Sequence, residues 1–439
     1  MSTDTQPIRQ ARMRLKLRLL PILVGVLLVW QLISPSKIWM VLLVGLGGAW
    51  LTGYIWSRAL YYSLYLHREM RFGWAQVGDH LQERFTLTDR GYMPGLWVEV
   101  IDHSSLPGIS VDRVSSVGGG SSVQWVTERI CEQRGVYNLG PTSVITGDLL
   151  GIYQVCIEYP HQAGLMVMPP IVPLPPIEIA PGGRAEEGRR LRHDAMEETV
   201  NASGVRDFRP GDALHHIHWP TTARRNELFV RQFESTPSSD WWVFLDLNEE
   251  VQAGAGWDST EEHGVILSAS LVDQGLKGGR SVGMVAYGDT LVWQPPQANP
   301  SQRLRIMRAL TTVHAGPYSL AQLLTRSAPS FTRQASLIII TPDVSGNWLE
   351  SLLPLVARGI APTVVLFDPR TFGGEGNTAA ISQMLARFKI QNYVFSKEVL
   401  DRPEARPGQR GQWEWKVLGT GRAVPLRKPA DLEWKDLPG

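Results

Sequence analysis

The sequence predicts a two-helix transmembrane hairpin, then an antiparallel β-sandwich, then an α/β domain whose parallel sheet is covered by helices on both faces. Two long apolar runs near the N-terminus predict the hairpin. Short alternating strands between turn residues predict the sandwich, and apolar strands alternating with helices predict the parallel sheet. The expected boundaries are 1–57 for the basic N-terminus and hairpin, 58–180 for the sandwich, 181–235 for a linker, 236–400 for the α/β domain and 401–439 for a tail.

The hairpin prediction depends on two apolar runs that are joined by a connection of four residues. Leu17–Ile33 carries its last charge at Arg18, and Ile38–Trp56 carries no charge. Both runs approach the roughly 20 residues that span a bilayer. A cleaved signal peptide is the alternative for the first run, but no small-residue cleavage site stands out. A buried globular hairpin is the alternative for both, but core helices alternate apolar and polar faces and these runs do not.

Positively charged residues flank the hairpin on its outer ends, whereas the connection carries only Lys37. Such residues are retained on the cytoplasmic side of a membrane. We therefore expect a multi-pass protein of the cell membrane, with both termini and the soluble body in the cytoplasm. The flanking residues are Arg9, Arg12, Arg14, Lys16 and Arg18 before the first run, and Arg58, Arg68 and Arg71 after the second.

Composition narrows the class of function. The net charge of +1 over 439 residues argues against a nucleic-acid-binding protein, which needs a basic face. Cys131 and Cys156 lie in separate strand-like segments and form neither a disulfide framework nor a zinc motif. We expect free thiols, which fit a reducing compartment.

The middle of the chain reads as short strands, among them Leu96–Ile101, Val123–Ile130 and Tyr153–Glu158, with turn residues at spacings of about ten. Six prolines between Pro169 and Pro181 exclude an interior strand or helix and predict a stiff exit from the sandwich. The following segment, 182–201, is rich in Arg and Glu and is expected to be a solvated loop.

Beyond residue 240, Trp241–Asp246 and Leu337–Thr341 read as apolar strands and Thr260–Lys277 as a helix. In open parallel sheets the functional crevice lies beyond the carboxyl ends of the strands. Polar residues at those ends are therefore candidates for function. They are Asp246, Asn248, Glu250, Thr341, Asp343 and Asp368.

Three motifs, Gly204–Asp212, Ile217–Arg224 and Leu228–Glu234, resemble the signature of the domain of unknown function 58 (DUF58) family. The hairpin, the RGxYxLGP motif at Arg134–Pro141 and the DxxG motif at Asp148–Gly151 resemble this family too. The resemblance covers about residues 15–370 and implies that the α/β domain is von Willebrand factor A-like. It also implies a MoxR-type AAA+ ATPase as partner, and the family has no established enzymatic activity.

The strand ends depart from the metal site of such domains. Where the metal-binding form has D-x-S-x-S, this chain has Asp246, Asn248 and Glu250, and the loop expected to supply a Thr reads Gly316–Ser319. Asp343 stands in the position of the later Asp. Because Mg²⁺ prefers carboxylate and amide oxygens, the candidate ligands of this degenerate site are Asp246, Asn248, Glu250 and Asp343. We expect weak Mg²⁺ binding or none, and no other cofactor.

Other motifs point away from catalysis. His215, His216 and His218 lie close together, but only the last two share a face of a strand, and we interpret the three as part of a structural turn and strand. The chain contains no G-x-S-x-G, H-E-x-x-H or Walker motif. The sequence therefore predicts no catalytic residue and no enzyme.

The signature segment is expected to have a structural or partner-binding role. Gly211 and Asp212 predict a tight turn, and Arg224 can form bidentate hydrogen bonds with a carboxylate. We expect the Asp212–Arg224 pair to lock the sandwich to the α/β domain, and a partner-binding face is the alternative. The residues carried over from the resemblance are Arg206, Gly211, Asp212, Trp219, Arg224 and Arg231.

Together these observations predict a membrane-tethered cytoplasmic interaction module that serves as an adaptor or client of a MoxR-type AAA+ ATPase. The alternative is an enzyme or a metal-dependent binding domain that acts at the crevice around Asp246 and Asp343. The lack of a recognisable nucleophile–base pair favours binding over catalysis.

Overall fold

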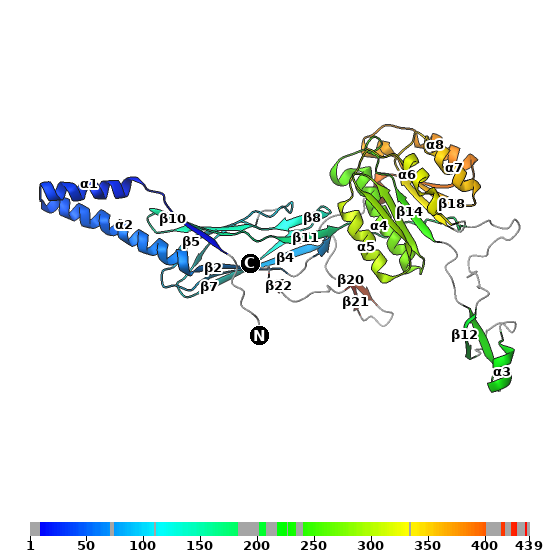
Figure 1. The fold of residues 1–439 in the computed structure, drawn as a ribbon, viewed down its shortest axis with the longest axis horizontal. Helices are drawn as coiled ribbons and strands as arrows, with labels where there is room; N and C mark the ends of the chain where they lie inside the picture. Colours follow the sequence, from blue (N-terminus) through cyan, green and yellow to red (C-terminus); the bar gives the residue numbers. More distant parts are fainter. Residues whose placement is uncertain are drawn as a thin grey trace. The chain divides into compact units, whose positions relative to one another are not determined.

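A computed structural model describes residues 9–70, 74–108, 111–182, 202–207, 217–225, 227–233, 240–332, 335–400, 414–417, 423–427 and 435–436. The fold is mixed α/β with several separate sheets (Figure 1). The chain divides into two compact units. Unit 1 comprises Met1–Pro170 with Arg402–Gly439, and unit 2 comprises Ile171–Asp401.

Unit 1 begins with strand β1 (Gln10–Leu15), which is followed by helices α1 (Leu19–Ile33) and α2 (Lys37–Ser63). Ser36 caps α2 by accepting a hydrogen bond from the Trp39 N–H at 3.4 Å. The two helices lie side by side (Figure 1). α2 has 27 residues and is long and apolar enough to cross a membrane.

The first expected membrane helix is shorter than the sequence indicates. α1 has 15 residues, fewer than the roughly 20 that a span needs. Arg12 and Arg14 belong to β1, which pairs with strand β10 (Tyr153–Tyr159), and the Lys16 N–H donates to Ile152 O at 2.8 Å. These backbone hydrogen bonds hold residues 10–16 on the sheet, so that the helix begins only at Leu19. Two spanning helices are thus not shown, and α2 is the single candidate among the described residues.

The strands of unit 1 form antiparallel sheets around a shared core. One sheet has the order β1-β10-β9-β5-β6, and another has the order β22-β2-β4-β7, in which β22 is Lys435–Asp436. In the smaller sheet, β3-β11-β8, the first pair is parallel. Buried residues alternate with partly exposed ones along β4 and β10, so that Phe85 and Ile157 reach one common core. The strands are β2 Leu64–Met70, β3 Trp74–Gln76, β4 His80–Asp89, β5 Gly95–Asp102, β6 Arg113–Val117, β7 Ser122–Ile130, β8 Gly135–Leu139, β9 Thr142–Gly147, β10 Tyr153–Tyr159 and β11 Ala163–Met168.

Four buried charged side chains bridge these sheets. The guanidinium of Arg68 contacts Glu83 Oε1 at 2.5 Å and Asp102 Oδ1 at 2.8 Å. Arg129 also contacts Glu83, and its Nη2 lies 3.4 Å from Asp102 Oδ2. Two positive and two negative groups therefore balance one another, which a buried cluster requires.

The second half of α2 packs on these strands. Ser57 and Leu60 are buried. Trp50 Nε1 donates to Tyr153 Oη at 2.7 Å, and Trp56 Nε1 donates to Pro94 O at 3.2 Å. In contrast, the first half of α2 exposes large apolar side chains, which are Ile38, Met40, Val41, Leu42 and Val44.

Unit 2 is built on a six-stranded sheet of order β16-β15-β14-β17-β18-β19. Its strands pair in parallel except for β16, which is antiparallel to β15. Every residue of β14 and β17 is buried, as expected for strands covered on both faces. The strands are β14 Trp241–Leu245, β15 Val282–Tyr287, β16 Leu291–Gln297, β17 Ser336–Thr341, β18 Ala361–Phe367 and β19 Gln391–Phe395.

Helices cover both faces of this sheet (Figure 1). Leu324, Leu352 and Leu385 bring α6, α7 and α8 against one face in a common core. α4 lies close on the other face, where a Cβ added to Gly264 would come 2.7 Å from Leu245 Cδ1. The helices are α4 Thr260–Lys277, α5 Pro300–Thr312, α6 Leu320–Ser327, α7 Leu349–Ala357, α8 Thr378–Arg387 and α9 Lys397–Leu400.

The proline-rich segment before unit 2's sheet is neither helix nor strand, as its sequence predicts. It is bound to the sheet through side-chain hydroxyls: the Ala180 N–H donates to Thr363 Oγ1 at 2.9 Å and the Gly182 N–H to Ser336 Oγ at 3.0 Å. Of the expected solvated loop at 182–201, residues 183–201 lie outside the described residues. The expected tail contributes β20 (Glu414–Val417), β21 (Ala423–Arg427) and β22 (Lys435–Asp436).

Candidate functional site

The candidate site lies at the carboxyl ends of β14 and β17, which are neighbours in the sheet. Asp246 directly follows β14, and its Oδ2 accepts a hydrogen bond from Thr341 Oγ1 at 2.6 Å. Its Oδ1 accepts the Asn248 N–H at 3.1 Å. Thr341 Oγ1 in turn accepts the Asp343 N–H at 2.9 Å. Both carboxylate oxygens of Asp246 are therefore engaged, and Thr341 connects the ends of the two strands.

The remaining expected ligands support the loops in which they lie. Asn248 Oδ1 accepts the Glu250 N–H at 3.2 Å, and Asp343 Oδ1 accepts the Ser345 N–H at 2.7 Å. The Glu250 side chain is exposed. Gln252 Nε2 donates to Asp246 O at 3.1 Å and to Asn248 O at 3.3 Å, which closes the loop after β14. The geometry is that of side chains stabilising turns.

Burial makes Asp246 an unusual carboxyl group. Desolvation raises its pKa to about 7, against the lowering effect of the hydrogen bonds from Thr341 and from the Asn248 N–H. The nearby negative charge of Asp343 raises the pKa further. Desolvation thus outweighs hydrogen bonding here, because a buried carboxylate loses its hydration.

The four predicted metal ligands are brought together only in part. Asp246 and Asp343 meet through Thr341, but Asn248 uses its oxygen within its own loop. Among the residues that the structure describes, no group of three or more His, Cys, Asp or Glu side chains is placed to hold a metal ion. The set does not fit a Mg²⁺ ion well, because the Glu250 side chain is exposed and Asn248 Oδ1 accepts an N–H of its own loop, so that too few carboxylate and amide oxygens are gathered. Weak or absent Mg²⁺ binding stays a prediction.

The loop expected to supply a Thr lies beside the site. Gly316 forms a bridge with Asn248, and the Gly316 N–H donates to Leu247 O at 2.8 Å. Next to it, the rings of Tyr318 and Tyr287 stack at 3.6 Å between centroids, and the Arg326 guanidinium lies 5.5 Å from the Tyr287 centroid. No sequence signal predicts this cluster, because its members come from three separate segments.

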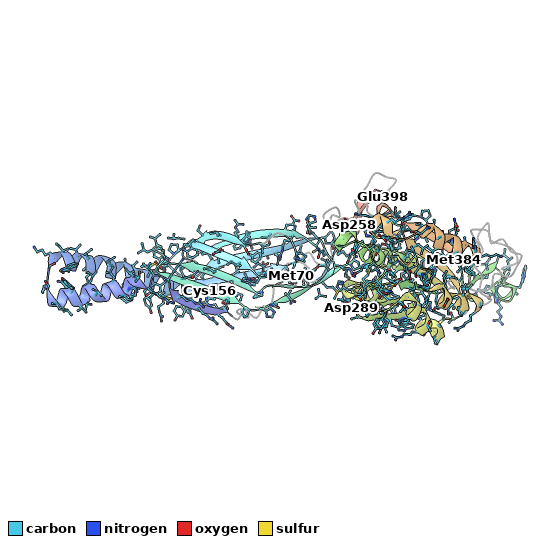
Figure 2. The ribbon with its side chains drawn as sticks, turned by 90° about the horizontal axis from the view of Figure 1, so that it is seen from above. Met70, Cys156, Asp258, Asp289, Met384 and Glu398 are labelled. Carbon is cyan, nitrogen blue, oxygen red and sulfur yellow. The ribbon has the colours of Figure 1, made fainter. Side chains whose placement is uncertain are left out.

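Figure 2 shows Asp258 and Asp289 at the same end of unit 2. Asp258 precedes α4 and Asp289 follows β15, which places both beside the strand ends. Asp258 pairs with Lys397 at 3.0 Å, and Asp289 Oδ1 accepts the His314 N–H at 3.1 Å. These carboxylates therefore also have partners within the fold.

The signature segment forms a small hairpin of β12 (Ala202–Asp207) and β13 (Phe229–Phe233), with α3 (Trp219–Arg225) between them. Arg206 pairs with Val230 and Val205 with Arg231 through the backbone. The side chains of Trp219, Arg224 and Arg225 are exposed on α3. His218 Nδ1 lies 2.7 Å from Thr221 Oγ1, a contact within the first turn of the helix.

Gly211 and Asp212, like His215 and His216, lie outside the described residues. The expected Asp212–Arg224 pair therefore stays a prediction. His218, the third imidazole, takes part in the local structure at the start of α3, through its ring and through its N–H, which donates to Phe229 O at 2.8 Å.

Residues 204–372 match the profile of a family described as "Protein of unknown function DUF58", which confirms the resemblance for this part of the chain. An uncharacterized protein of Mycobacterium tuberculosis is 22% identical over 169 residues, which cover 37% of this chain and 53% of that protein. An uncharacterized protein of Bacillus subtilis is 29% identical over 161 residues, which cover 36% of this chain and 37% of the relative. The chain thus spans about half of the first relative's length and less of the second.

Similar solved structures are distant. An aerotolerance-related membrane protein from Bacteroides fragilis aligns with a TM-score of 0.23 at 16% identity, covering 29% of this chain and 67% of that chain. A β-glucosidase from Listeria innocua in complex with glucose aligns with a TM-score of 0.15 at 10% identity, covering 24% and 16%. Neither alignment identifies a fold or an activity.

Proposed function

We propose that this chain is a membrane-tethered protein-interaction module and an adaptor or client of a MoxR-type AAA+ ATPase. In this proposal α1 and α2 form a two-pass transmembrane hairpin, the body lies in the cytoplasm, and unit 2 is a von Willebrand factor A-like domain without a working metal site. The resemblance to the DUF58 family supports the partner class.

Chain connectivity favours two crossings over one. β1 precedes α1 and β2 follows α2, and both strands belong to unit 1. If α2 alone crossed a bilayer, β1 and β2 would lie on opposite sides of it, and the pairing of β1 with β10 would be lost. In the proposed topology the chain therefore returns through α1 and α2 to the side from which it started. The short α1 reaches about 22 Å, and tilt, local thinning of the bilayer or Lys37 at the tip can accommodate the difference.

Charge favours a cytoplasmic body. Arg12 and Arg14 lie on the exposed side of β1, and Lys16 and Arg18 are exposed between β1 and the body of α1. Arg58 lies on α2 near the strands, whereas Lys37 is the single charged residue at the tip. Positively charged residues favour the cytoplasmic face.

Binding at a surface fits unit 2 better than chemistry in the crevice. Asp246 is buried and engaged by Thr341 and Asn248. A general base or nucleophile needs an accessible atom within reach of substrate. The proposal therefore assigns the strand ends a structural role.

The assignment of an interaction surface to α3 depends on its exposed tryptophan. Trp219 is 65% exposed on a helix that also presents Arg224 and Arg225. Tryptophan and arginine are the residue types that contribute most to protein interfaces. A partner that covers a large exposed aromatic side chain removes its apolar surface from water, which favours binding. We therefore place the partner-binding face on α3.

The test measures binding of the detergent-solubilised full chain to a purified MoxR-type ATPase from the same cells by biolayer interferometry. Trp219→Ala is expected to weaken binding about thirtyfold or more, which corresponds to the loss of about 2 kcal/mol that defines an interface hot spot. Leu291→Ala is the matched control, since Leu291 is 56% exposed on the edge strand β16 of the same unit. Equal affinity of wild type and Trp219→Ala would reject α3 as the binding face. No measurable binding of the wild type would reject the ATPase partner.

A further inference from the structure

The end of unit 1 that carries the helices also exposes large apolar side chains outside the helices. Tyr92 is 99% exposed in the loop between β4 and β5. Leu149 and Leu150 are 69% and 58% exposed in the turn between β9 and β10. Apolar side chains of this size that gather beside an apolar helix indicate an interaction surface. We call these three residues, with the exposed cations Lys16, Arg18 and Arg58, the rim.

Direct contacts place the rim around the helices. Asp148, which begins the turn of Leu149 and Leu150, lies against α2, where a Cβ added to Gly53 would come 3.2 Å from Asp148 Oδ2. The start of α1 reaches the same turn, because the Leu17 N–H donates to Ile152 O at 3.2 Å. Leu20 packs with Ile152 in one buried cluster. The turn is thus held between the two helices.

The other rim loop meets α2 slightly farther along. Trp56 Nε1 donates to Pro94 O, two residues after Tyr92. At the other end of this loop, the Arg90 N–H donates to Ser63 O at 2.9 Å, so that the loop contacts α2 between Trp56 and Ser63. The rim therefore extends along α2 from Gly53 to Ser63, on both sides of Arg58, where the apolar run ends.

Depth along α2 identifies what covers the rim. The charge-free stretch Ile38–Ser57 is about 30 Å long, the thickness of a hydrocarbon core. Gly53 precedes Arg58 by about 7 Å of helix rise. When this stretch spans the bilayer, Leu149 and Leu150 reach the boundary between headgroups and acyl chains. The rim cations lie at the level where they contact anionic headgroups.

The turn is built to tolerate this environment. Asp148 is buried, and its carboxylate accepts the N–H groups of Leu150 at 3.0 Å, Ile152 at 3.1 Å and Tyr153 at 2.6 Å. These bonds satisfy backbone donors that would otherwise be exposed to lipid, where an unpaired polar group is costly. The turn can therefore present Leu149 and Leu150 without free backbone donors at those three positions.

We propose that the rim is a lipid-binding surface: Tyr92, Leu149 and Leu150 insert into the interface of an anionic bilayer, and Lys16, Arg18 and Arg58 bind its headgroups. The inference rests on the membrane tether proposed above. It adds that unit 1 itself is seated on the bilayer and is not merely suspended from its helices. Continuity of the apolar helices with the rim, together with its positive charge, favours lipid over a protein as the occupant.

The test uses the full chain in vesicles of phosphatidylcholine with a minority of phosphatidylglycerol. Single cysteines labelled with NBD replace Leu150, Val136 or Val41 in a Cys156→Ser background. Cys131 stays unlabelled, because it is buried and desolvation raises the pKa of its thiol to about 12. Val136 is 55% exposed on β8, far from the helices, and so matches Leu150 in exposure (Figure 1). Val41 on α2 reports on the tether.

Lipids with a nitroxide near the headgroup are expected to quench NBD at position 150 and leave it unchanged at 136. Emission at 150 should also shift to the blue on reconstitution. Quenching at 41 by nitroxides deeper in the chains, without quenching at 150, would overturn the rim and leave the tether standing. Absence of quenching at both positions would overturn the tether itself. A blue shift at 150 without quenching by lipid would assign the surface to a protein contact and overturn lipid binding.

Discussion

Replacing Asp246 by Asn should stabilise unit 2 at alkaline pH, and the size of the effect follows from the buried carboxyl group. The pKa of Asp246 is raised from 3.8 to about 7, mainly by desolvation. Each pKa unit corresponds to about 1.36 kcal/mol, so that ionised Asp246 costs the folded state at most about 4 kcal/mol. Asn has the same shape and is never charged.

The sign follows from proton binding. Below about pH 4 the carboxyl group is protonated in both states and there is no penalty. Between about pH 4 and 7 the folded state holds a proton that the unfolded chain releases, so that the free energy of unfolding falls as pH rises. Above about pH 7 the penalty is constant. The free energy of unfolding of Asp246→Asn should therefore be about 1–4 kcal/mol higher than that of the wild type at pH 8. At pH 4 the variant should show no such gain.

Hydrogen exchange of the full chain measures this free energy locally. Amides of β14 and β17 should exchange more slowly in Asp246→Asn than in wild type at pH 8, after correction for the intrinsic rate. Asp368→Asn is the control of opposite sign. The hydrogen bond from Arg370 lowers the pKa of Asp368. Ionised Asp368 therefore stabilises the folded state above the pKa that it has in the unfolded chain, and this stabilisation is lost as pH falls. If protection of β14 and β17 falls equally with pH in wild type and Asp246→Asn, Asp246 does not carry the penalty.

Three further predictions test other parts of the molecule. Calorimetry at millimolar Mg²⁺ should show no heat and no shift in melting temperature, whereas a sub-millimolar dissociation constant abolished by Asp246→Ala would show a working site. Protease added to sealed right-side-out cells should leave the body beyond the hairpin intact, and its digestion would reverse the proposed orientation. Arg68→Met should lower the free energy of unfolding of unit 1 by about 3–5 kcal/mol, because it leaves buried Glu83 with one cation fewer. As a control, Arg84→Met, which breaks a more exposed pair with Glu69, should cost at most about 1 kcal/mol. Urea titration measures the free energy of unfolding of both variants.

Much of the fold follows from local patterns. Apolar runs predict helices at 17–33 and 38–56, and the structure has helices at 19–33 and 37–63. Alternation of apolar residues identifies strands such as β4 and β10. The fully apolar runs Trp241–Leu245 and Leu337–Ile340 indicate strands buried on both faces, because only such strands need no polar side. Motif spacing also identifies the signature segment, whose family match is confirmed over residues 204–372.

The start of α1 shows where local pattern fails. Apolar character alone extends the helix back to Leu17, but backbone pairing of β1 with β10, some 140 residues away, holds the preceding residues in a strand. Tertiary hydrogen bonds outweigh local helix preference there.

By itself, the sequence determined the order of the apolar and polar segments, the charge on each side of the hairpin and the polar residues that follow each strand of unit 2. The tertiary structure alone decided which of those residues meet. Thr341 reaches Asp246 across 95 positions. Arg68 reaches Glu83 and Asp102, and the same two carboxylates also contact Arg129. The periodicity of apolar residues predicts only which side chains share a face within a few positions along the chain. Contacts between distant segments depend on strand order and register, which arise only when the sheets assemble and bury their shared core.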